Sequence, residues 1–584
     1  MSDHIAARLA NLKPFGKQGS DDDDQGGQID IDSVGGGGRH NRKTDHAKEQ
    51  LRVSRALRIF LAKEGVIAER DAALDTELQS DAVRKLLSRT SFDAPEDLLV
   101  RSHPLPEYFI SSSHNTYLIA HQLYGTSSAS AYETALKTGS RCVEIDAWDN
   151  SADEEEPKVT HGYTLVSHIP FRAVCETIRN VFDEEKALAA SDPAYTVAPI
   201  LLSLENHCAE HGQLRLVQIM KEVFGDRLLS EAVRELGHRE QEDTGEHVSL
   251  QELGPRIAVI VEHHIPGEVE DSDSPSSSES DDEEEKRARK EYKASSKEKE
   301  AAASIIVPEL AELGVYAQSV KPSDNSWYDP GQLVNGPHHH LINVSESGLA
   351  KHLPANSSAI AIHNSQHLMR VYPKGTRIGS SNLKPVSFWG IGAQICALNW
   401  QTFGTSNQLN DALFSGSEGY VLKPAALRAG GNGVISTGRK KRLRLHVAGA
   451  TDIPLHEDRE ADSIKPYLTC NLYSPCKIDG ETNKRKTSPY KHHKLGILHR
   501  GDSNPPATDP LWHETLEWTY EDNELVFLRM LIKSDDAWAR NPMFAVAAVR
   551  LEYTVPGWSF IRLMDMKGGE TKCTVLVRFE VDDV

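Results

Sequence analysis

The sequence has few cysteines, no long apolar run and no excess of positive charge. Its seven cysteines among 584 residues lack CxxC spacing, which excludes a disulfide framework and a cysteine zinc site and is typical of reduced cytosolic thiols. No apolar run approaches the roughly 20 residues that cross a bilayer, and the first residues form no secretory signal or myristoylation site. The formal charge of −21 argues against nonspecific nucleic-acid binding. We therefore expect a cytoplasmic protein that has no nucleic-acid partner.

Length and composition divide the chain into several segments. At 584 residues, a prior of roughly 150 residues per domain predicts three or four units. Residues 1–45 are rich in Gly, Asp and Ser and poor in apolar side chains, so we expect a disordered acidic tail. Residues 46–100 carry apolar side chains such as Leu57 and Leu61 at helical spacing. This pattern predicts two or three short helices and leaves a degenerate EF-hand remnant open.

An α/β pattern fills the middle of the chain. Between residues 101 and 266, short apolar runs such as CVEIDAW and PILLSLEN alternate with helical stretches, as in a parallel α/β fold. Residues 267–301 are acidic and then basic, with almost no apolar side chain, which predicts a disordered linker. The α/β pattern resumes over 302–428. We therefore expect one TIM-like barrel that is split by an acidic linker.

The C-terminal quarter has a different periodicity. A glycine-rich stretch over 429–440 predicts a hinge at the end of the barrel. From 441 to 584, apolar and polar residues alternate in runs such as RLRLHV and CTVLVRFEV. Such alternation is typical of strands with one buried face, so we expect a C-terminal antiparallel β-sandwich.

Two carboxylates lie two residues apart in the run Arg141–Asp149. In an extended strand, Glu144 and Asp146 point to the same face. Two adjacent carboxylates repel each other unless a cation or a proton lies between them, and their hard oxygens suit calcium or magnesium. A solvated strand face is the alternative, but the apolar residues that alternate with them favour an interior site.

Further polar residues follow other predicted strands. His114 and Asn115 leave the first apolar run, His161 lies in a loop after an acidic insertion, and Glu205 ends the run PILLSLEN. Each motif alone is weak evidence. In parallel α/β barrels the active site lies at the C-terminal ends of the strands. The convergence of histidines, carboxylates and an amide at these ends therefore predicts a catalytic site.

These motifs, in this order, resemble the catalytic first half of the eukaryotic phosphoinositide-specific phospholipases C. The resemblance is to delta-like enzymes of fungal-type architecture without an N-terminal pleckstrin domain, and it covers roughly residues 105–584. The second half of the resemblance lies after the linker, and the C-terminal sandwich is similar to a C2 domain. The motifs of that second half are Ser345-Glu346-Ser347, Arg370-Val371-Tyr372-Pro373, Asn399-Trp400-Gln401-Thr402 and Gly419-Tyr420-Val421-Leu422-Lys423-Pro424.

The resemblance implies calcium-dependent hydrolysis of phosphoinositides to diacylglycerol and inositol phosphates through a 1,2-cyclic phosphate. In this scheme Glu144 accepts the proton of the inositol 2-hydroxyl, with Glu205 as the alternative base. His114 stabilises charge on the phosphoryl oxygens, and His161 protonates the departing diacylglycerol oxygen. The implied Ca²⁺ ligands are Asn115, Glu144, Asp146 and Glu205.

The resemblance also places Ser345, Arg370 and Tyr372 around the inositol ring. Arg370 suits bidentate phosphate contact, and Tyr372 suits stacking on the sugar. The family usually carries two lysines in the strand RIAVIVEHH, where this chain has Ile260 and Glu262. Because a glutamate repels the extra ring phosphates, we expect less phosphorylated phosphoinositides among the substrates. The preference among phosphatidylinositol and its phosphates stays open.

Phosphoinositide lipids at a membrane surface are the expected partners, with peripheral membrane association. Leu123, Tyr163 and Leu165 in loops beside the two histidines predict a membrane-contacting ridge. No protein activator is indicated, and calcium binding by the C2-like domain stays open. Two alternatives remain, a catalytically silent phosphoinositide-binding scaffold and a barrel phosphodiesterase of soluble glycerophosphodiesters. The scaffold is disfavoured because no implied catalytic residue is missing, and the second alternative because of the C2-like domain and the ring site.

Overall fold

A computed structural model describes residues 51–584 except 75–77, 120–125, 161–166, 194, 235–246, 266–304, 332, 376, 378–379, 458, 493–503 and 536–542. The described chain forms two compact units. The first contains Asp97–Ser406 and Glu418–Val434, and the second contains 51–96, Asn407–Ser417 and Ile435–Val584. Among the described residues, no helix combines the length and apolar character that crossing a membrane requires.

The first unit is a closed barrel of parallel strands. The strands pair in parallel in chain order, and the last pairs with the first. A parallel bridge between Ser112 and Cys142 completes the ring. This arrangement confirms the predicted TIM-like barrel. The barrel strands are β1 (Tyr108–Ile110) with β2 (Ser113–His114), β5 (Cys142–Trp148), β8 (Ile200–His207), β9 (Ile257–Glu262), β10 (Gln318–Val320), β11 (His340–Ser345), β12 (Leu368–Tyr372) and β13 (Ile395–Cys396) with β14 (Leu398–Asn399).

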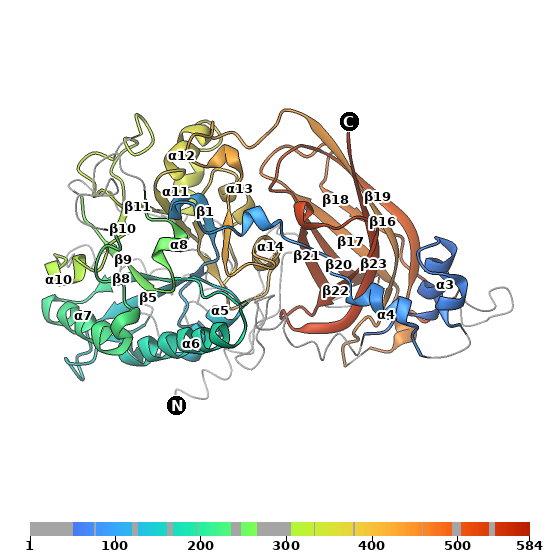
Figure 1. The fold of residues 1–584 in the computed structure, drawn as a ribbon, viewed down its shortest axis with the longest axis horizontal. Helices are drawn as coiled ribbons and strands as arrows, with labels where there is room; N and C mark the ends of the chain where they lie inside the picture. The colour runs from blue at the N-terminus through green and yellow to red at the C-terminus, as the bar shows by residue number, and fades with distance from the viewer. Residues whose placement is uncertain are drawn as a thin grey trace, which may run out of the picture. The chain divides into compact units, whose positions relative to one another are not determined.

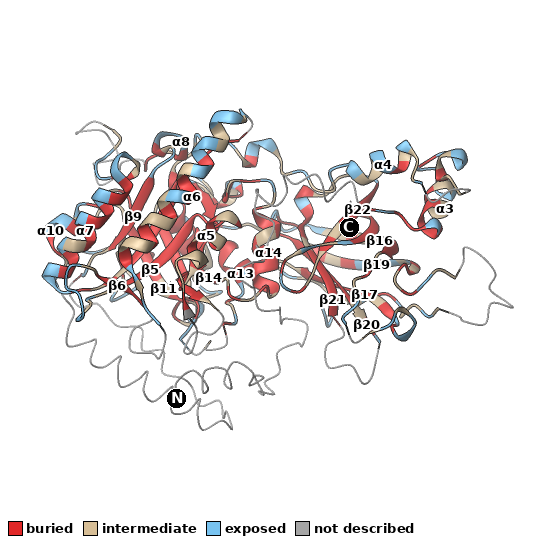
Figure 2. Cartoon of the chain, turned by 90° about the horizontal axis from the view of Figure 1, so that it is seen from below, coloured by how far each residue is buried: buried red, intermediate tan, exposed pale blue. Residues whose placement is uncertain are grey.

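Helices surround the barrel and bury its outer face. Figure 1 shows α5, α6 and α7 along one side of the strands, and Figure 2 shows β5 and β9 buried while the outer faces of these helices are exposed. The helices of this unit are α5 (Ser130–Lys137), α6 (Phe171–Ser191), α7 (Glu210–Phe224), α8 (Leu250–Leu253), α10 (Pro308–Ala311), α11 (Glu346–Ala350), α12 (Ser357–Asn364) and α13 (Pro385–Trp389). Its peripheral strands are β3 (Leu118–Ile119), β4 (Thr126–Ser127), β6 (Lys158–Val159), β7 (Ile169–Pro170) and β15 (Tyr420–Leu422).

Strand alternation decides which side chains face into the barrel. Val143, Ile145 and Ala147 of β5 join the apolar core formed with the helices. Because successive strand residues point to opposite faces, Glu144 and Asp146 point inward. The same alternation holds in β8, where the even-numbered Ile200, Leu202 and Leu204 pack in this core, and in β9, where the odd-numbered Ile257, Val259 and Val261 do so. In these strands, alternation therefore places Glu144, Asp146 and Glu205 on the face that points into the barrel.

The second unit is an antiparallel β-sandwich, as predicted for a C2-like domain. Its strand order is β18-β17-β20-β21-β22-β23-β16-β19, and a single residue pair, Val546 with Met564, joins the two halves of this order. The two layers enclose an apolar core that includes Leu445, Trp518 and Ile532. The strands are β16 (Lys440–Thr451), β17 (Pro466–Tyr473), β18 (Lys484–Lys486), β19 (Leu511–Glu521), β20 (Phe527–Ser534), β21 (Met543–Arg550), β22 (Trp558–Met564) and β23 (Glu570–Asp583).

Two N-terminal helices pack on this sandwich. α3 (Arg55–Lys63) and α4 (Asp81–Ser88) begin at Ser54 and Ser80, whose hydroxyls accept hydrogen bonds from the first helical turn. Leu57 of α3 lies in one apolar cluster with Trp558. The predicted helical region is therefore present and belongs to the same unit as the sandwich. The helix α14 (Thr405–Leu413) begins in the last two residues of Asp97–Ser406, and its remainder is assigned to the second unit. The predicted disordered tail (1–45) and linker (267–301) lie outside the described residues.

Candidate active site

Three carboxylates converge at the C-terminal ends of two adjacent barrel strands. Glu144 and Asp146 lie on β5, and the parallel register of β5 and β8 places Glu205 directly beside Asp146. Ligand oxygens of the three side chains lie within 4.8 Å of one another, and they form the one group of this kind in the described part of the chain. Clustered carboxylate oxygens are the ligands that Ca²⁺ prefers. The donor set therefore fits the predicted calcium site.

Asn115 enters this cluster through an unusual backbone conformation. Its φ of 46° lies in the left-handed region, which asparagine tolerates better than most residues. This turn directs its backbone N–H to Glu144 Oε2 at 2.6 Å. The Tyr117 hydroxyl lies 3.1 Å from Asn115 Oδ1 and 2.6 Å from Asp146 Oδ2. The Asn115 amide oxygen thus lies next to the Tyr117 hydroxyl that also contacts Asp146 Oδ2.

Arg370 neutralises part of the negative charge. Its guanidinium, 1% exposed, donates to Glu144 Oε1 through Nη2. Nη1 donates to Asn343 Oδ1 at 3.1 Å and lies 3.8 Å from Glu205 Oε1. Register explains this contact, because Asn343 of β11 lies opposite Arg370 of β12. The predicted ring-phosphate ligand is therefore in contact with two predicted calcium ligands.

The two glutamates titrate very differently. Burial raises the pKa of Glu144 well above its usual value, and the charges of Glu205 and Asp146 raise it further against the opposing charge of Arg370. Burial alone would also raise the pKa of Glu205. The Arg370 guanidinium and a hydrogen bond with Glu144 outweigh that effect and hold this pKa at about 2. Glu144 is consequently the more basic of the two carboxylates in the ion-free chain.

His114 is oriented by a residue that sequence reasoning did not assign to the site. His114 Nδ1 lies 2.8 Å from Asn399 Oδ1. The Asn399 amide nitrogen donates to the Ser381 carbonyl at 2.9 Å, so its oxygen must face the imidazole and accept from Nδ1–H. Nε2 of His114 then faces the carboxylates, 3.9 Å from Glu144 Oε2. In the sequence, the one indication that Asn399 belongs to the site is its place in the motif Asn399-Trp400-Gln401-Thr402, which the phospholipase family shares.

Ser345 and Tyr372 lie side by side at the ends of β11 and β12. Ser345 is buried, and its hydroxyl oxygen accepts from the Gly348 N–H at 3.0 Å, which caps α11. The Tyr372 ring lies 5.5 Å from the Arg370 guanidinium carbon. The structure thus brings these two predicted ring-binding residues to the same end of the barrel as Arg370.

Glu262 and Ile260 face the barrel interior. Their neighbours Ile257, Val259 and Val261 pack in the outer core, and alternation turns the other residues of β9 inward. Glu262 Oε2 accepts from the Asn206 N–H at 3.2 Å. Burial raises the pKa of Glu262, opposed chiefly by the charge of Lys321 after β10. An acidic group therefore stands where the resemblance expects a lysine.

Several predicted residues lie outside the described part of the chain. These are His161 and the proposed ridge residues Leu123, Tyr163 and Leu165. The catalytic, substrate and metal roles of all the predicted site residues stay predictions.

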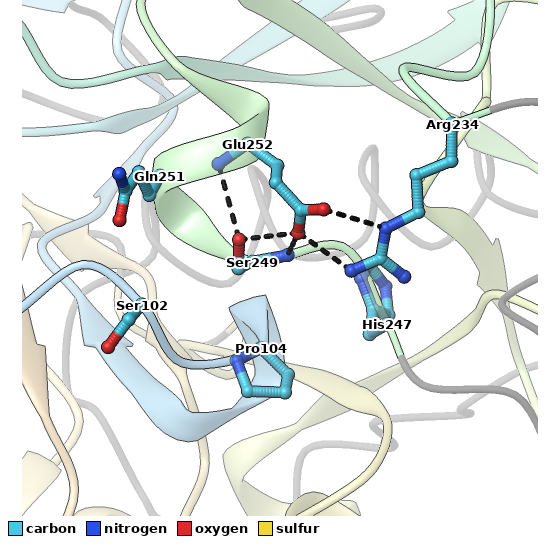
Figure 3. Close-up of a pocket in the computed structure, with 7 residues that line it drawn as sticks. All are labelled: Ser102, Pro104, Arg234, His247, Ser249, Gln251 and Glu252. Carbon is cyan, nitrogen blue, oxygen red and sulfur yellow. Dashed lines mark hydrogen bonds and ion pairs between the residues drawn. The ribbon is translucent and has the colours of Figure 1, made fainter.

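A separate pocket opens at the opposite end of the barrel. Its residues precede β1 and β9, whereas the carboxylates lie at the far ends of their strands. Figure 3 shows Arg234 paired with Glu252 in this pocket of about 510 Å³. Because this ion pair balances the charge of the guanidinium, the described lining residues offer no cluster of charge for catalysis. The lining residues are Ser102, Pro104, Arg234, His247, Ser249, Gln251 and Glu252.

Comparison with known proteins identifies both barrel halves. Residues 101–263 match the phosphatidylinositol-specific phospholipase C X domain, and residues 310–426 match the corresponding Y domain. The boundary between the two matches falls between β9 and β10. Every residue of the candidate site, from His114 to Asn399, lies within one of these two matches.

Curated relatives match over most of the chain. A 1-phosphatidylinositol 4,5-bisphosphate phosphodiesterase delta-3 from Mus musculus is 32% identical over 82% of this chain and 57% of its own. A 1-phosphatidylinositol 4,5-bisphosphate phosphodiesterase 1 from Candida albicans is 28% identical over 82% of this chain and 48% of its own. The chain thus spans about half the length of these relatives.

A solved structure shares the fold. The crystal structure of PLC21 from L. pealei aligns with a TM-score of 0.67 and 22% identity, covering 94% of this chain and 67% of that one. The alignment extends over both units, so barrel and sandwich occur together in the solved protein as they do here.

Proposed function

Because the chain belongs to the eukaryotic phosphoinositide-specific phospholipases C, we propose that it hydrolyses phosphoinositides to diacylglycerol and inositol phosphates. The reaction is calcium-dependent and passes through a 1,2-cyclic phosphate. The observation that carries the proposal is the convergence of Glu144, Asp146 and Glu205 beside an oriented His114. In this proposal the protein is a cytoplasmic enzyme that associates peripherally with membranes.

Asn115, Glu144, Asp146 and Glu205 would hold the calcium ion. The ion, when bound, polarises the phosphoryl oxygen and lowers the pKa of the inositol 2-hydroxyl. The observation that supports this site is the donor set itself, three carboxylates and an amide oxygen at one end of the barrel. The side chains of the protein carry out the proton transfers and stabilise the charge on the phosphate.

Glu144 takes the proton from the inositol 2-hydroxyl. Its carboxylate lies 3.9 Å from Nε2 of His114, the group expected to meet the phosphate, and this position supports that role. Protonated His114 donates through Nε2–H to the phosphoryl oxygens, because Asn399 already accepts from Nδ1. His161 protonates the diacylglycerol oxygen as it leaves, and in the second step it accepts a proton from the water that opens the cyclic phosphate. Glu205 is the alternative base if Glu144 is committed to the ion.

The substrate range extends to less phosphorylated phosphoinositides. The relatives are named as 4,5-bisphosphate phosphodiesterases, yet this chain has Glu262 and Ile260 facing the barrel interior. A buried carboxylate there disfavours a ring that carries extra phosphates. Lys321 compensates part of that charge. Ser345, Arg370 and Tyr372 contact the ring.

Release of water-soluble inositol phosphates from mixed vesicles tests the activity. Each phosphoinositide is presented at the same surface fraction, with and without calcium, to wild type and to His161→Ala. We expect calcium-dependent release by wild type and a loss of at least about 100-fold in the variant, since general acid catalysis contributes that much. A wild type that binds the lipids without releasing product would instead establish the silent scaffold.

A further inference from the structure

Both oxygens of the Glu144 carboxylate are already engaged by this chain's own donors. Oε2 accepts from the Asn115 N–H, and Oε1 accepts from Arg370 Nη2. Calcium requires six to eight oxygen ligands at about 2.3–2.6 Å. If Oε1 kept the guanidinium and also bound the ion, the two cations would lie close together in a buried site, and their repulsion would weaken the binding of both.

Arg370 is tied to the same carboxylates that calcium needs. It touches Glu144 and lies 3.8 Å from Glu205, both of them predicted ligands. Its guanidinium is 1% exposed, so water screens its charge poorly. Its remaining partner is Asn343, a neutral amide. Apart from these contacts, the ring of Tyr372, two residues later on the same strand β12, lies 5.5 Å away.

We infer that Arg370 and calcium compete for Glu144 and Glu205, so that Arg370 sets the affinity for calcium. This inference rests on the proposed function, because it assumes a calcium ion at these carboxylates. Calcium binding withdraws Glu144 Oε1 from Arg370 and leaves the guanidinium held by Asn343. The released Nη2 then faces the end of the barrel where Ser345 and Tyr372 lie, ready for a ring phosphate.

The exchange couples the two ligands of the enzyme. A phosphate bound to Arg370 draws the guanidinium away from the carboxylates and thereby favours calcium. By linkage, calcium favours the phosphorylated ring by the same factor. Arg370 is in this sense a positioning residue for the metal as well as a substrate ligand.

Isothermal titration of calcium into the full chain without lipid tests the competition. Arg370→Met keeps most of the side-chain volume and removes the charge, whereas Arg370→Lys keeps a charge. We expect calcium to bind Arg370→Met at least about tenfold more tightly than wild type, with Arg370→Lys within threefold of wild type. Arg377→Met is the matched control, because Arg377 pairs with Glu346 outside the cluster, and its calcium affinity stays that of wild type.

Each result decides between distinct claims. If wild type binds calcium and Arg370→Met binds it no more tightly, the competition is wrong while the proposed function stands. If wild type does not bind calcium, the proposed calcium dependence itself is wrong.

A second measurement needs no variant and therefore does not depend on the folding of Arg370→Met. Inositol 1,4-bisphosphate should bind wild type more tightly with calcium than without it, and equal affinities would overturn the coupling.

Discussion

The imidazole Nδ1 of His114 lies 2.8 Å from Oδ1 of Asn399, a residue 285 positions later in the chain. His114 ends β2 in the first barrel half, and Asn399 ends β14 in the second. A second contact joins the same two halves of the barrel: the Trp400 indole N–H donates to the Ser112 carbonyl at 3.0 Å. The histidine expected to act on the phosphate is therefore held in place by the other half of the barrel.

Replacing Asn399 by alanine should slow catalysis without weakening substrate binding. The variant removes the acceptor that fixes the His114 ring, and loss of such an orienting partner typically costs about 10–100-fold. We expect kcat to fall by that factor while KM stays within about twofold of wild type, measured on mixed vesicles. An unchanged kcat would show that His114 needs no orientation by Asn399.

Replacing Glu262 by lysine should shift substrate preference toward the bisphosphate. The change introduces a positive charge where the barrel now presents a carboxylate, and a lysine attracts the extra ring phosphates. We expect the ratio of bisphosphate to phosphatidylinositol hydrolysis to rise by roughly tenfold, which corresponds to about 1.4 kcal/mol. Glu262→Gln is the control for loss of charge alone, and an unchanged ratio in Glu262→Lys would exclude position 262 from head-group recognition.

Breaking the ion pair between Arg141 and Glu185 should destabilise the barrel. Arg141 Nη2 lies 2.7 Å from Glu185 Oε1, and the two side chains are 6% and 1% exposed. Removing one partner leaves a buried charge unpaired, so we expect Glu185→Ala to lower the free energy of unfolding by about 3 kcal/mol or more. Unfolding in guanidinium chloride, monitored by tryptophan fluorescence, measures the loss in the free energy of unfolding.

The exposed pair of Arg172 with Glu222 serves as the control for that experiment. Its atoms are also 2.7 Å apart, but its side chains are 34% and 44% exposed. Solvent screens such pairs, so Glu222→Ala should leave unfolding almost unchanged. Equal effects of the two substitutions would mean that burial of the Arg141 pair does not govern its contribution.

His247 should make the stability of the barrel depend on pH. Burial lowers its pKa from 6.5 to about 4, so below pH 6.5 the unfolded chain binds a proton that the folded chain does not. Stability should therefore be highest above pH 6.5 and fall as the pH drops toward 4. The contribution of one histidine is about 1.4 kcal/mol per pH unit at most.

His247→Gln removes this titration with little other change. The histidine Nε2 lies 3.0 Å from the Tyr316 carbonyl, and a glutamine amide can donate to the same oxygen. Calorimetric unfolding of the variant between pH 7 and 4.5 should show a shallower loss of stability than wild type. Parallel curves would mean that His247 binds no extra proton on unfolding.

Alternation and strand ends were enough to predict much of the fold and part of the site. The spacing of Glu144 and Asp146, with apolar residues between them, indicates a shared inward face, and the structure confirms the barrel and the sandwich. The closeness of Glu205 to Asp146 depends on the register between β5 and β8, which a single sequence does not contain. The same limit explains why Asn399 was not assigned, since its partner lies 285 residues away.

Side-chain chemistry indicates what a residue can bind but not which partner it meets. Arg370 was expected to bind ring phosphate because a guanidinium suits phosphate, and carboxylates suit it equally well. Only the β11–β12 register and the barrel closure place it against Glu144. Likewise, helical spacing predicts α3 and α4, whereas their packing against Trp558 of the sandwich depends on contacts far apart in sequence.

The division of the site between the two barrel halves has a consequence for incomplete chains. A product that stopped after β9 would keep all three carboxylates and His114. It would lack both Asn399 and Arg370, which reach His114 and Glu144 across separations of 285 and 226 residues. Premature termination would therefore yield a fragment that keeps the three carboxylates and lacks the side chains that contact His114 and Glu144 from the second half. On the proposed function, activity would therefore appear only after both halves of the barrel have been synthesised.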